Sequence, residues 1–215
     1  MKASIAAMIF AAMVALASMM RAGEATGTST SSVPRPSALL PPGSITKRVY
    51  AVERLEVHTP RNVTIVKARL AQQLGNITQT SILGATATSQ ASYTAAVDDN
   101  KGPAGYIWFL SIFHGRWFRL WGFADPRAYV PKEMTQYTIG NPLVLLTFAR
   151  FTIDAFLNAP IRILVYDTVE GGTTIVWDRP CTQLVLPGAP AAAYTTCRLL
   201  DDQISMLVQF IAYGA

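Results

Sequence analysis

The chain has 215 residues, a formal net charge of +5 from 18 Lys and Arg against 13 Asp and Glu, and 51% hydrophobic residues. Its basic residues are scattered rather than clustered, which argues against a dedicated nucleic-acid surface. The sequence holds no Cys-x-x-Cys pair and no cluster of histidines, so we expect no metal site and no cofactor.

The N-terminus has the pattern of a secretory signal peptide over residues 1–25. A short positive region precedes an uncharged apolar run at 3–20, and a segment of small residues follows it. Cleavage after Ala25 is preferred, with Ala17 and Ala22 as other sites, and an uncleaved anchor is the alternative to cleavage. We therefore expect a secreted, extracellular protein that has no membrane attachment once the signal is removed.

Two further features are typical of an exported chain. Asn62 and Asn76 each begin an Asn-x-Thr sequon, which is an acceptor of N-linked glycans in a eukaryotic host. The only two cysteines, Cys181 and Cys197, are predicted to form one disulfide in an oxidising compartment. Two buried free thiols are the alternative.

Composition divides the rest of the chain into three parts. Residues 26–46 are rich in Ser, Thr and Pro and poor in core-forming residues, so they are expected to form a disordered leader. Residues 47–184 are expected to form one α+β domain of ordinary size. Residues 185–215 are expected to be a C-terminal extension with an amphipathic helix, because apolar residues recur at helical spacing from Leu200 onward.

In the first half of the domain the pattern predicts a strand over 48–57. A helix capped by Thr59, with Pro60 in its first turn, is expected to follow and to end at Gly75. The segment 77–101 is dominated by Ser, Thr, Ala and Gln, so it is expected to form loops and short extended pieces.

The second half of the domain has clearer signals. Aromatic and β-branched residues over 105–121, broken at His114-Gly115, predict a hairpin of two strands. Asn141-Pro142 predicts the start of a very apolar, largely buried helix. Strands are expected at 161–166 and 173–177, joined by a glycine turn. The sum is an α+β fold, a compact antiparallel sheet with helices packed mainly on one face.

Four pieces of the chain, taken in order, resemble domain of unknown function family 302 (DUF302). They are Ile112-Phe113-His114, Gly140-Asn141-Pro142, Ala-Pro-x-Arg-x-Leu-Val-Tyr at 159–166, and Trp-Asp-x-Pro at 177–180. The resemblance covers residues 47–184, although 77–101 match only loosely. It implies the α+β fold already described, often as a homodimer, and it implies no assigned reaction.

His114 is the candidate catalytic residue, because histidine is the natural general acid or base near neutral pH. Its alternative role is that of a turn residue bonded to neighbouring backbone. Ser111 lies nearby in sequence, but the chain has no Gly-x-Ser-x-Gly motif. Its carboxylate doublets, Asp98-Asp99 and Asp201-Asp202, are adjacent residues that point apart on a strand or helix, so they do not suit glycoside cleavage. The protein is therefore expected not to be an enzyme.

Asn141 is the candidate ligand-binding residue, with Arg162 and Arg179 as charged partners. Free amides at the start of its helix could hold an anion or carboxylate. The alternative is that Asn141 only caps the helix while the arginines pair with Asp167 or Asp178.

We expect a non-catalytic protein that binds a small molecule or a protein partner. Its pocket is expected to be lined by Trp108, Phe109, Trp117 and Trp121. An extracellular hydrolase that uses His114 is the first alternative, and a structural protein of the cell surface or wall is the second.

Overall fold

The computed structural model describes residues 46–76, 87–120 and 129–214. The expected signal peptide, and the expected leader apart from its last residue, lie outside these ranges. The chain divides into two units, Met1–Arg48 and Val49–Ala215, and the described helices and strands all lie in the second unit.

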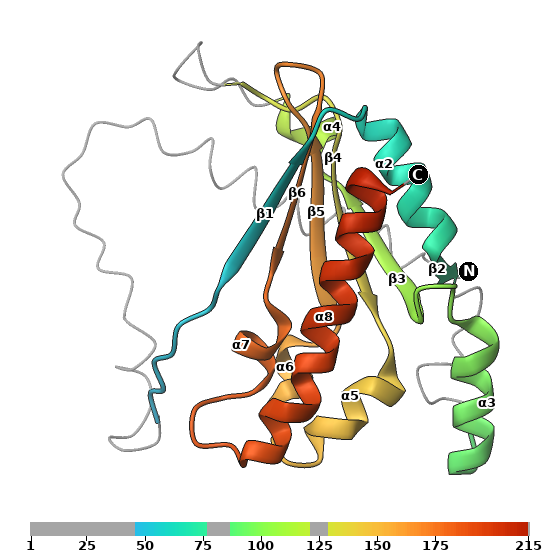
Figure 1. Cartoon of the computed structure of the whole chain (residues 1–215), viewed down its shortest axis with the longest axis vertical. Helices are drawn as coiled ribbons and strands as arrows, with labels where there is room; N and C mark the ends of the chain where they lie inside the picture. The colour runs from blue at the N-terminus through green and yellow to red at the C-terminus, as the bar shows by residue number, and fades with distance from the viewer. Residues whose placement is uncertain (1–45, 77–86, 121–128, 215) are drawn as a thin grey trace, which may run out of the picture. The chain divides into compact units, whose positions relative to one another are not determined.

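The predicted α+β fold is confirmed, since helices pack against one mixed sheet (Figure 1). The strand order is β1-β6-β5-β4-β3-β2. Neighbouring strands are antiparallel except at one edge, where β2 runs parallel to β3. Here the sheet differs from the expected antiparallel one, because the chain crosses over through α3 between these two strands. The strands are β1 (Arg54–Thr59), β2 (Leu74–Asn76), β3 (Tyr106–Phe113), β4 (Met134–Gly140), β5 (Ile161–Asp167) and β6 (Thr173–Asp178).

The long C-terminal helix α8 packs over one face of the sheet (Figure 1), and the residues that it buries recur at helical spacing. Leu200, Ile204 and Ile211 are buried in the same core as alternate residues of β5, such as Ile163. Helices α2 and α5 join α8 on this face, as expected from the sequence. The helices are α2 (Val63–Gln73), α3 (Gln90–Asn100), α4 (His114–Phe118), α5 (Pro142–Ala149), α6 (Ala155–Asn158), α7 (Pro180–Leu184) and α8 (Ala191–Tyr213).

The other face of the sheet is more open. Arg54, Glu56 and His58 of β1 are exposed there, and Leu164 and Val176 beside them are half-buried. The alternation between the two faces follows from the period of two in a strand, so one set of side chains meets the helices and the other meets solvent.

The predicted strands at 161–166 and 173–177 are confirmed as β5 and β6, which pair as a hairpin. Gly171 in the connecting turn has φ 86°, a left-handed conformation that glycine adopts without steric cost. The strand predicted at 48–57 begins later, at Arg54. The cap predicted at Thr59 is wrong: Asn62 caps α2, and the Thr59 hydroxyl donates instead to the carbonyl of Ala212.

The hairpin predicted within 105–121 is wrong because long-range pairing overrides the local pattern. Residues 114–118 form the short helix α4 instead of a second strand, and β3 pairs with β4. A Cβ on Gly115 would lie 2.6 Å from the carbonyl oxygen of Lys132, so the backbone at this position packs directly against the segment that leads into β4. Strand β4 itself was not predicted, since one of its three buried positions is the polar Thr135 and the apolar alternation is limited to Tyr137 and Ile139.

The segment expected to be loops and short extended pieces contains helix α3. Its start is a capping box, in which Ser89 and Ser92 each accept a hydrogen bond from the other's backbone N–H. Val97 is the one buried residue of α3 and packs on Ile107, so the sequence shows no apolar stripe. The expectation that α5 is largely buried is also wrong, because only Phe148 and Ala149 are buried in it.

Candidate functional site

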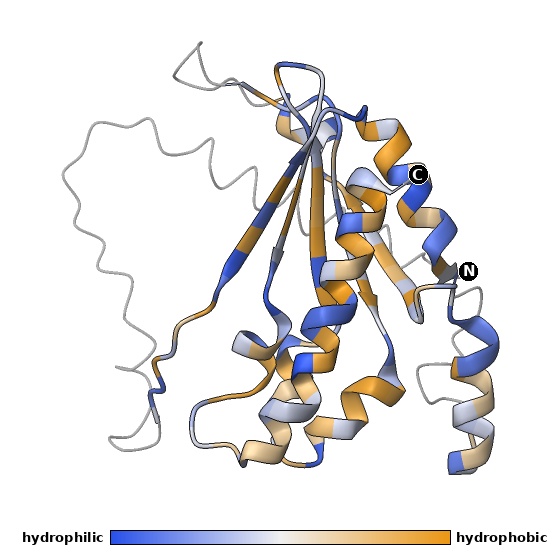
Figure 2. Ribbon diagram, viewed as in Figure 1, coloured by the Kyte–Doolittle hydropathy of each residue, from blue (hydrophilic) through white to orange (hydrophobic). Residues whose placement is uncertain are grey.

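A cleft of about 360 Å³ opens at the end of the sheet where β4 gives way to α5. Helices α5 and α6 form its sides, and the loop that leads into β5 forms part of its floor. Figure 2 shows the hydrophobic colouring of α5 beside this end of the strands. The walls include Tyr93, Phe109, Val144, Leu145, Phe148 and Phe156.

The local sequence explains why the chain turns here. Gly140 ends β4, Asn141 caps α5, and Pro142 occupies the first helical position, where its missing N–H costs nothing. A Cβ on Gly140 would lie 3.3 Å from both Phe109 and Pro160, so a side chain at this position would crowd the floor of the cleft.

Asn141 lines the cleft, yet both ends of its amide are already engaged. Its Oδ1 accepts hydrogen bonds from the N–H groups of Leu143 at 2.9 Å and Val144 at 3.4 Å. Its Nδ2 donates to the carbonyl of Gly105 at 2.8 Å, which ties α5 to the start of β3. The structure therefore shows Asn141 as the cap of α5, which the sequence analysis gave as the alternative to ligand binding.

The remaining lining is apolar, and none of the described residues around the cleft carries a charge. Tyr93 adds the one phenol, and burial raises its pKa above the ordinary value of 10.0, so it is neutral at physiological pH. A lining of this kind favours a molecule whose enclosed part is apolar.

The segment that carries Phe156 exposes further large apolar side chains. Phe156 lines the cleft and is 50% exposed, while Ile153 and Leu157 in the same segment are 77% and 86% exposed. An exposed apolar patch of this kind can mark a binding site.

The other predicted ligand-binding residues lie elsewhere. Arg162 is exposed on the open face of the sheet, in a hollow that it shares with Arg54. The Nε of Arg179 lies 2.9 Å from a carboxylate oxygen of Glu53, an ion pair without hydrogen-bond geometry. Asn141, Arg162 and Arg179 thus line three different hollows.

The expected carboxylate partners of the arginines are engaged differently. Asp178 receives hydrogen bonds from Arg54 at 2.8 and 3.2 Å. Asp167 accepts from the hydroxyl of Tyr129 and from the backbone N–H of Glu133.

His114 begins α4, at the end of the sheet away from the cleft. Its ring meets the ring of Trp117 edge-on, with centroids 5.6 Å apart, and makes no hydrogen bond or ion pair with another described residue. The Oγ of Ser111 is buried without a hydrogen-bond partner among the described residues. The geometry therefore joins His114 to neither an acid nor a nucleophile within the described part of the chain.

The aromatic residues that were expected to line one pocket lie in different parts of the molecule. Phe109 lines the cleft, Trp108 packs against Tyr137 on the core side, and Trp117 is exposed on α4. Trp121 lies outside the described residues. The residues of α5 and α6 that line the cleft were not identified from the sequence. One signal for them was present, because α5 is a short helix that is apolar on all sides, and such a helix can face a cleft as well as a core.

The two cysteines lie at disulfide distance, with their Cα atoms 5.5 Å apart, and they connect α7 to α8. Across the described ranges, three or more His, Cys, Asp or Glu side chains never gather in a way that could hold a metal ion. In the same ranges, no helix combines the length and the hydropathy needed to cross a bilayer.

Comparisons with known proteins give a likeness of structure. No family model and no curated protein sequence matches the chain. Among solved structures, the chain is similar to the crystal structure of an uncharacterized conserved DUF302 protein from Bacillus stearothermophilus, with a TM-score of 0.47 and 11% identity over 73% of this chain and 95% of that one. This is the family that the sequence motifs resemble. The likeness concerns the course of the chain, and it implies neither a ligand nor a reaction.

Proposed function

We propose that the protein is a non-catalytic binding protein that takes up a small, largely apolar molecule in the cleft between α5 and α6. The observation that carries the proposal is a cleft of about 360 Å³ whose described lining is uncharged and whose one amide, that of Asn141, already has its partners. Its volume falls within the range of small-molecule sites.

The chemistry of the lining narrows the ligand class. A charged group would lose its hydration in this cleft without gaining a partner, so the enclosed part of the ligand must be uncharged. A polar end can remain at the mouth, in water. For about 20 non-hydrogen atoms at about 0.3 kcal/mol each, we expect a dissociation constant of about 40 µM.

The proposal includes export of the protein. The apolar run at the N-terminus supports it, as does the spacing of Cys181 and Cys197, which fits a disulfide of an oxidising compartment. Asn62 is exposed and uses its Oδ1 to cap α2, accepting from the N–H of Thr64 at 2.8 Å. Asn76 is exposed at the end of β2. Both asparagines therefore stay predicted glycosylation sites.

The experiment is a titration with N-phenyl-1-naphthylamine, an uncharged probe whose fluorescence rises in apolar surroundings. We compare the wild type with Val144→Phe, which places a larger side chain in the cleft. The control is Ile65→Phe, which makes the same kind of enlargement on the exposed side of α2.

We expect Val144→Phe to weaken probe binding by about tenfold or more and Ile65→Phe to change it by less than about twofold. Thermal unfolding of both variants establishes that they are folded. A folded Val144→Phe protein that binds the probe as the wild type does would remove the cleft from consideration. So would a wild type that does not bind the probe at about 100 µM.

A further inference from the structure

A second hollow, of about 220 Å³, lies at the opposite end of β4 from the apolar cleft. It is framed by Met134 and Thr135 at the start of β4, while Gly140 at the end of the strand lines the cleft. Six steps along a strand separate the two places by about 20 Å. Figure 1 shows α4, beside this hollow, and α5, beside the cleft, at opposite ends of the sheet.

The hollow has an excess of positive charge. Lys67, Arg116 and Lys132 line it, whereas Glu133 is the one acidic residue among its described lining. The Nζ of Lys67 lies 2.9 Å from a carboxylate oxygen of Glu133, so these two charges compensate each other. Arg116 and Lys132 form no ion pair with any described residue, and their charges are left to attract an anion.

A buried hydroxyl completes the set of donors. Thr135 lines the hollow, is 1% exposed, and its Oγ1 has no hydrogen-bond partner among the described residues. Burial removes the hydrogen bonds that a polar group makes with water, so buried polar groups normally have a hydrogen-bond partner within the protein or in a ligand. An anionic oxygen in the hollow would accept a hydrogen bond from this hydroxyl.

The backbone next to Lys132 is fixed by hydrogen bonds to Asp167. Asp167 accepts from the N–H of Glu133 at 3.0 Å, and its own N–H donates to the carbonyl of Glu133 at 3.0 Å. The hydroxyl of Tyr129 donates to the same carboxylate at 2.9 Å. These contacts fix the chain next to Lys132, so the site is organised in advance.

One wall of the hollow is aromatic. The ring of Phe113 is 52% exposed and lies 5.7 Å from the Nζ of Lys67. An anion with an aromatic or short apolar body would place that body against this ring and its charged group toward Lys132 and Arg116.

We propose that this hollow binds a small organic anion, whose carboxylate or phosphate group is held by Lys132, Arg116 and the hydroxyl of Thr135. The site differs from the apolar cleft in place and in chemistry, and the proposal does not depend on the function proposed for the cleft.

The test is isothermal titration of the full chain with phenyl phosphate, benzoate and inorganic phosphate. Benzamide, which has the same ring and no charge, is the neutral control. We expect phenyl phosphate or benzoate to bind with a dissociation constant of about 1 mM, and we expect benzamide not to bind. The three anions separate the contribution of the charged group from that of the ring.

Two variants test whether Lys132 and Thr135 hold the anion. Lys132→Ala removes a charge and Thr135→Val removes only a hydroxyl, and each is expected to weaken binding of the anion by about fivefold or more. Lys101→Ala is the control, since Lys101 pairs with Asp98 on α3. Probe binding in the cleft is expected to be unchanged in all three variants, which separates failure of this proposal from failure of the first.

Three outcomes would overturn the proposal. One is equal binding of benzamide and benzoate. Another is anion binding that neither Lys132→Ala nor Thr135→Val weakens. The third is the absence of binding by all three anions at about 10 mM.

Discussion

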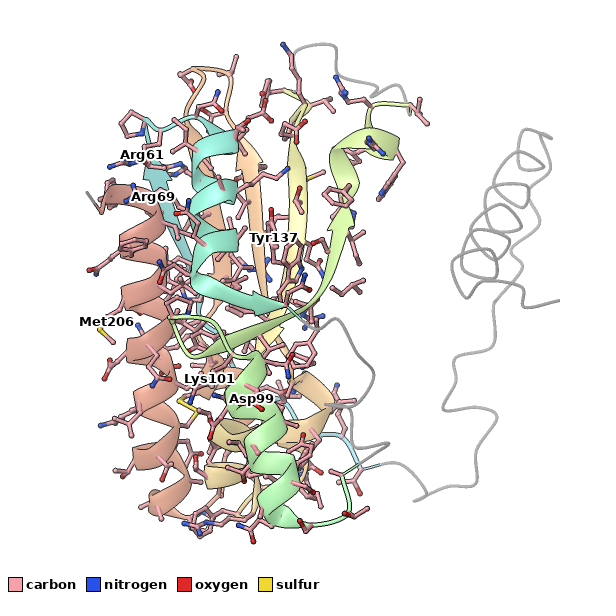
Figure 3. All side chains as sticks on the ribbon, turned by 90° about the vertical axis from the view of Figure 1, so that its right-hand side faces the viewer. Arg61, Arg69, Asp99, Lys101, Tyr137 and Met206 are labelled. Atoms are coloured by element: carbon pink, nitrogen blue, oxygen red, sulfur yellow. A yellow bond between two sulfur atoms is a disulfide. The ribbon has the colours of Figure 1, made fainter. Side chains whose placement is uncertain are left out.

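Arg61 donates hydrogen bonds from Nε to the carbonyl oxygen of Ala212 at 2.9 Å and from a terminal nitrogen to that of Gly214 at 2.7 Å. One arginine thus satisfies the last carbonyls of α8, which have no partner inside the helix, and brings positive charge to the negative end of the helix dipole. Figure 3 shows Arg61 beside this end of α8. The contact joins the start of α2 to the C-terminal helix.

Replacing Arg61 should therefore destabilise the protein. We expect Arg61→Met to lower the free energy of unfolding by about 1–2 kcal/mol, because the carbonyls of Tyr213 and Gly214 lose the donor Arg61 and that of Ala212 keeps only the Thr59 hydroxyl. The control is Arg54→Met, which removes an exposed pair with Asp178 and should cost less than about 1 kcal/mol. Urea unfolding of both variants provides the comparison, and equal costs would contradict the capping role.

The stability of the protein should respond differently to valine at two buried threonines. The hydroxyl of Thr59 donates to the carbonyl of Ala212 at 2.8 Å, whereas that of Thr135 has no partner among the described residues. Thr59→Val should cost about 1–2 kcal/mol of stability, and Thr135→Val should leave stability unchanged or raise it by up to about 1 kcal/mol. Urea unfolding in buffer without phosphate measures both. A large loss in Thr135→Val would show that its hydroxyl has a partner in the free protein.

Asn141 should be important mainly for folding. Asn141→Ala removes the cap of α5 and the bond to Gly105, so we expect a loss of about 1–2 kcal/mol. Asn141→Ser keeps a capping oxygen and loses only the bond to Gly105, and it should cost about half as much. Thermal unfolding of the two variants tests this order, which would be reversed or absent if the cap were not formed.

Formation of the Cys181–Cys197 disulfide should stabilise the protein by lowering the conformational entropy of the unfolded chain. The cysteines are 16 residues apart, and a loop of this length corresponds to about 3 kcal/mol. Reduction should lower the melting temperature by about 3 °C per kcal/mol lost. The intact mass should rise by one hydrogen per sulfur at the same time. A chain that is fully reduced after purification in air would contradict the bond.

Asp201 should make stability depend on pH. Burial raises the pKa of its carboxyl above the ordinary value of 3.8, against the opposing effects of the Cys181 N–H and the charge of Arg179. The folded state then holds this proton more tightly than the unfolded state does, so its contribution to stability is largest below pH 3.8 and falls as pH rises through the raised pKa.

The variant Asp201→Asn removes this dependence and keeps an oxygen that can accept from Cys181. Its melting temperature relative to the wild type should therefore increase as the pH is raised from about 3 toward neutrality. Asp202→Asn, on the exposed side of the same turn, controls for the loss of one negative charge. A difference between Asp201→Asn and the wild type that stays constant with pH would contradict the assignment.

Elements whose burial follows a simple period could be predicted from the sequence. In β5 the residues Ile161, Ile163 and Val165 alternate with outward positions, and Gly171 marks the turn to β6. In α8 the buried residues recur at helical spacing. In both cases one face of the element contacts the core along its whole length, so the pattern is complete within the segment itself.

Other elements depend on contacts that the local sequence does not contain. Helix α3 buries only Val97, and its position is set by Ile107 on a later strand. Strand β4 is recognisable only once its neighbours β3 and β5 are known. Asn141 was identified as a candidate residue, but the partner of its Nδ2, Gly105, is 36 residues away in sequence.

The two edge strands of the described sheet affect the tendency of the folded protein to aggregate. An edge strand has unpaired backbone groups that can template the addition of a foreign strand. At one edge β2 has only three residues, and at the other β1 carries the charged or polar side chains Arg54, Glu56 and His58. Both features discourage such growth, so the native sheet is poorly suited to edge-to-edge association into fibres at high concentration.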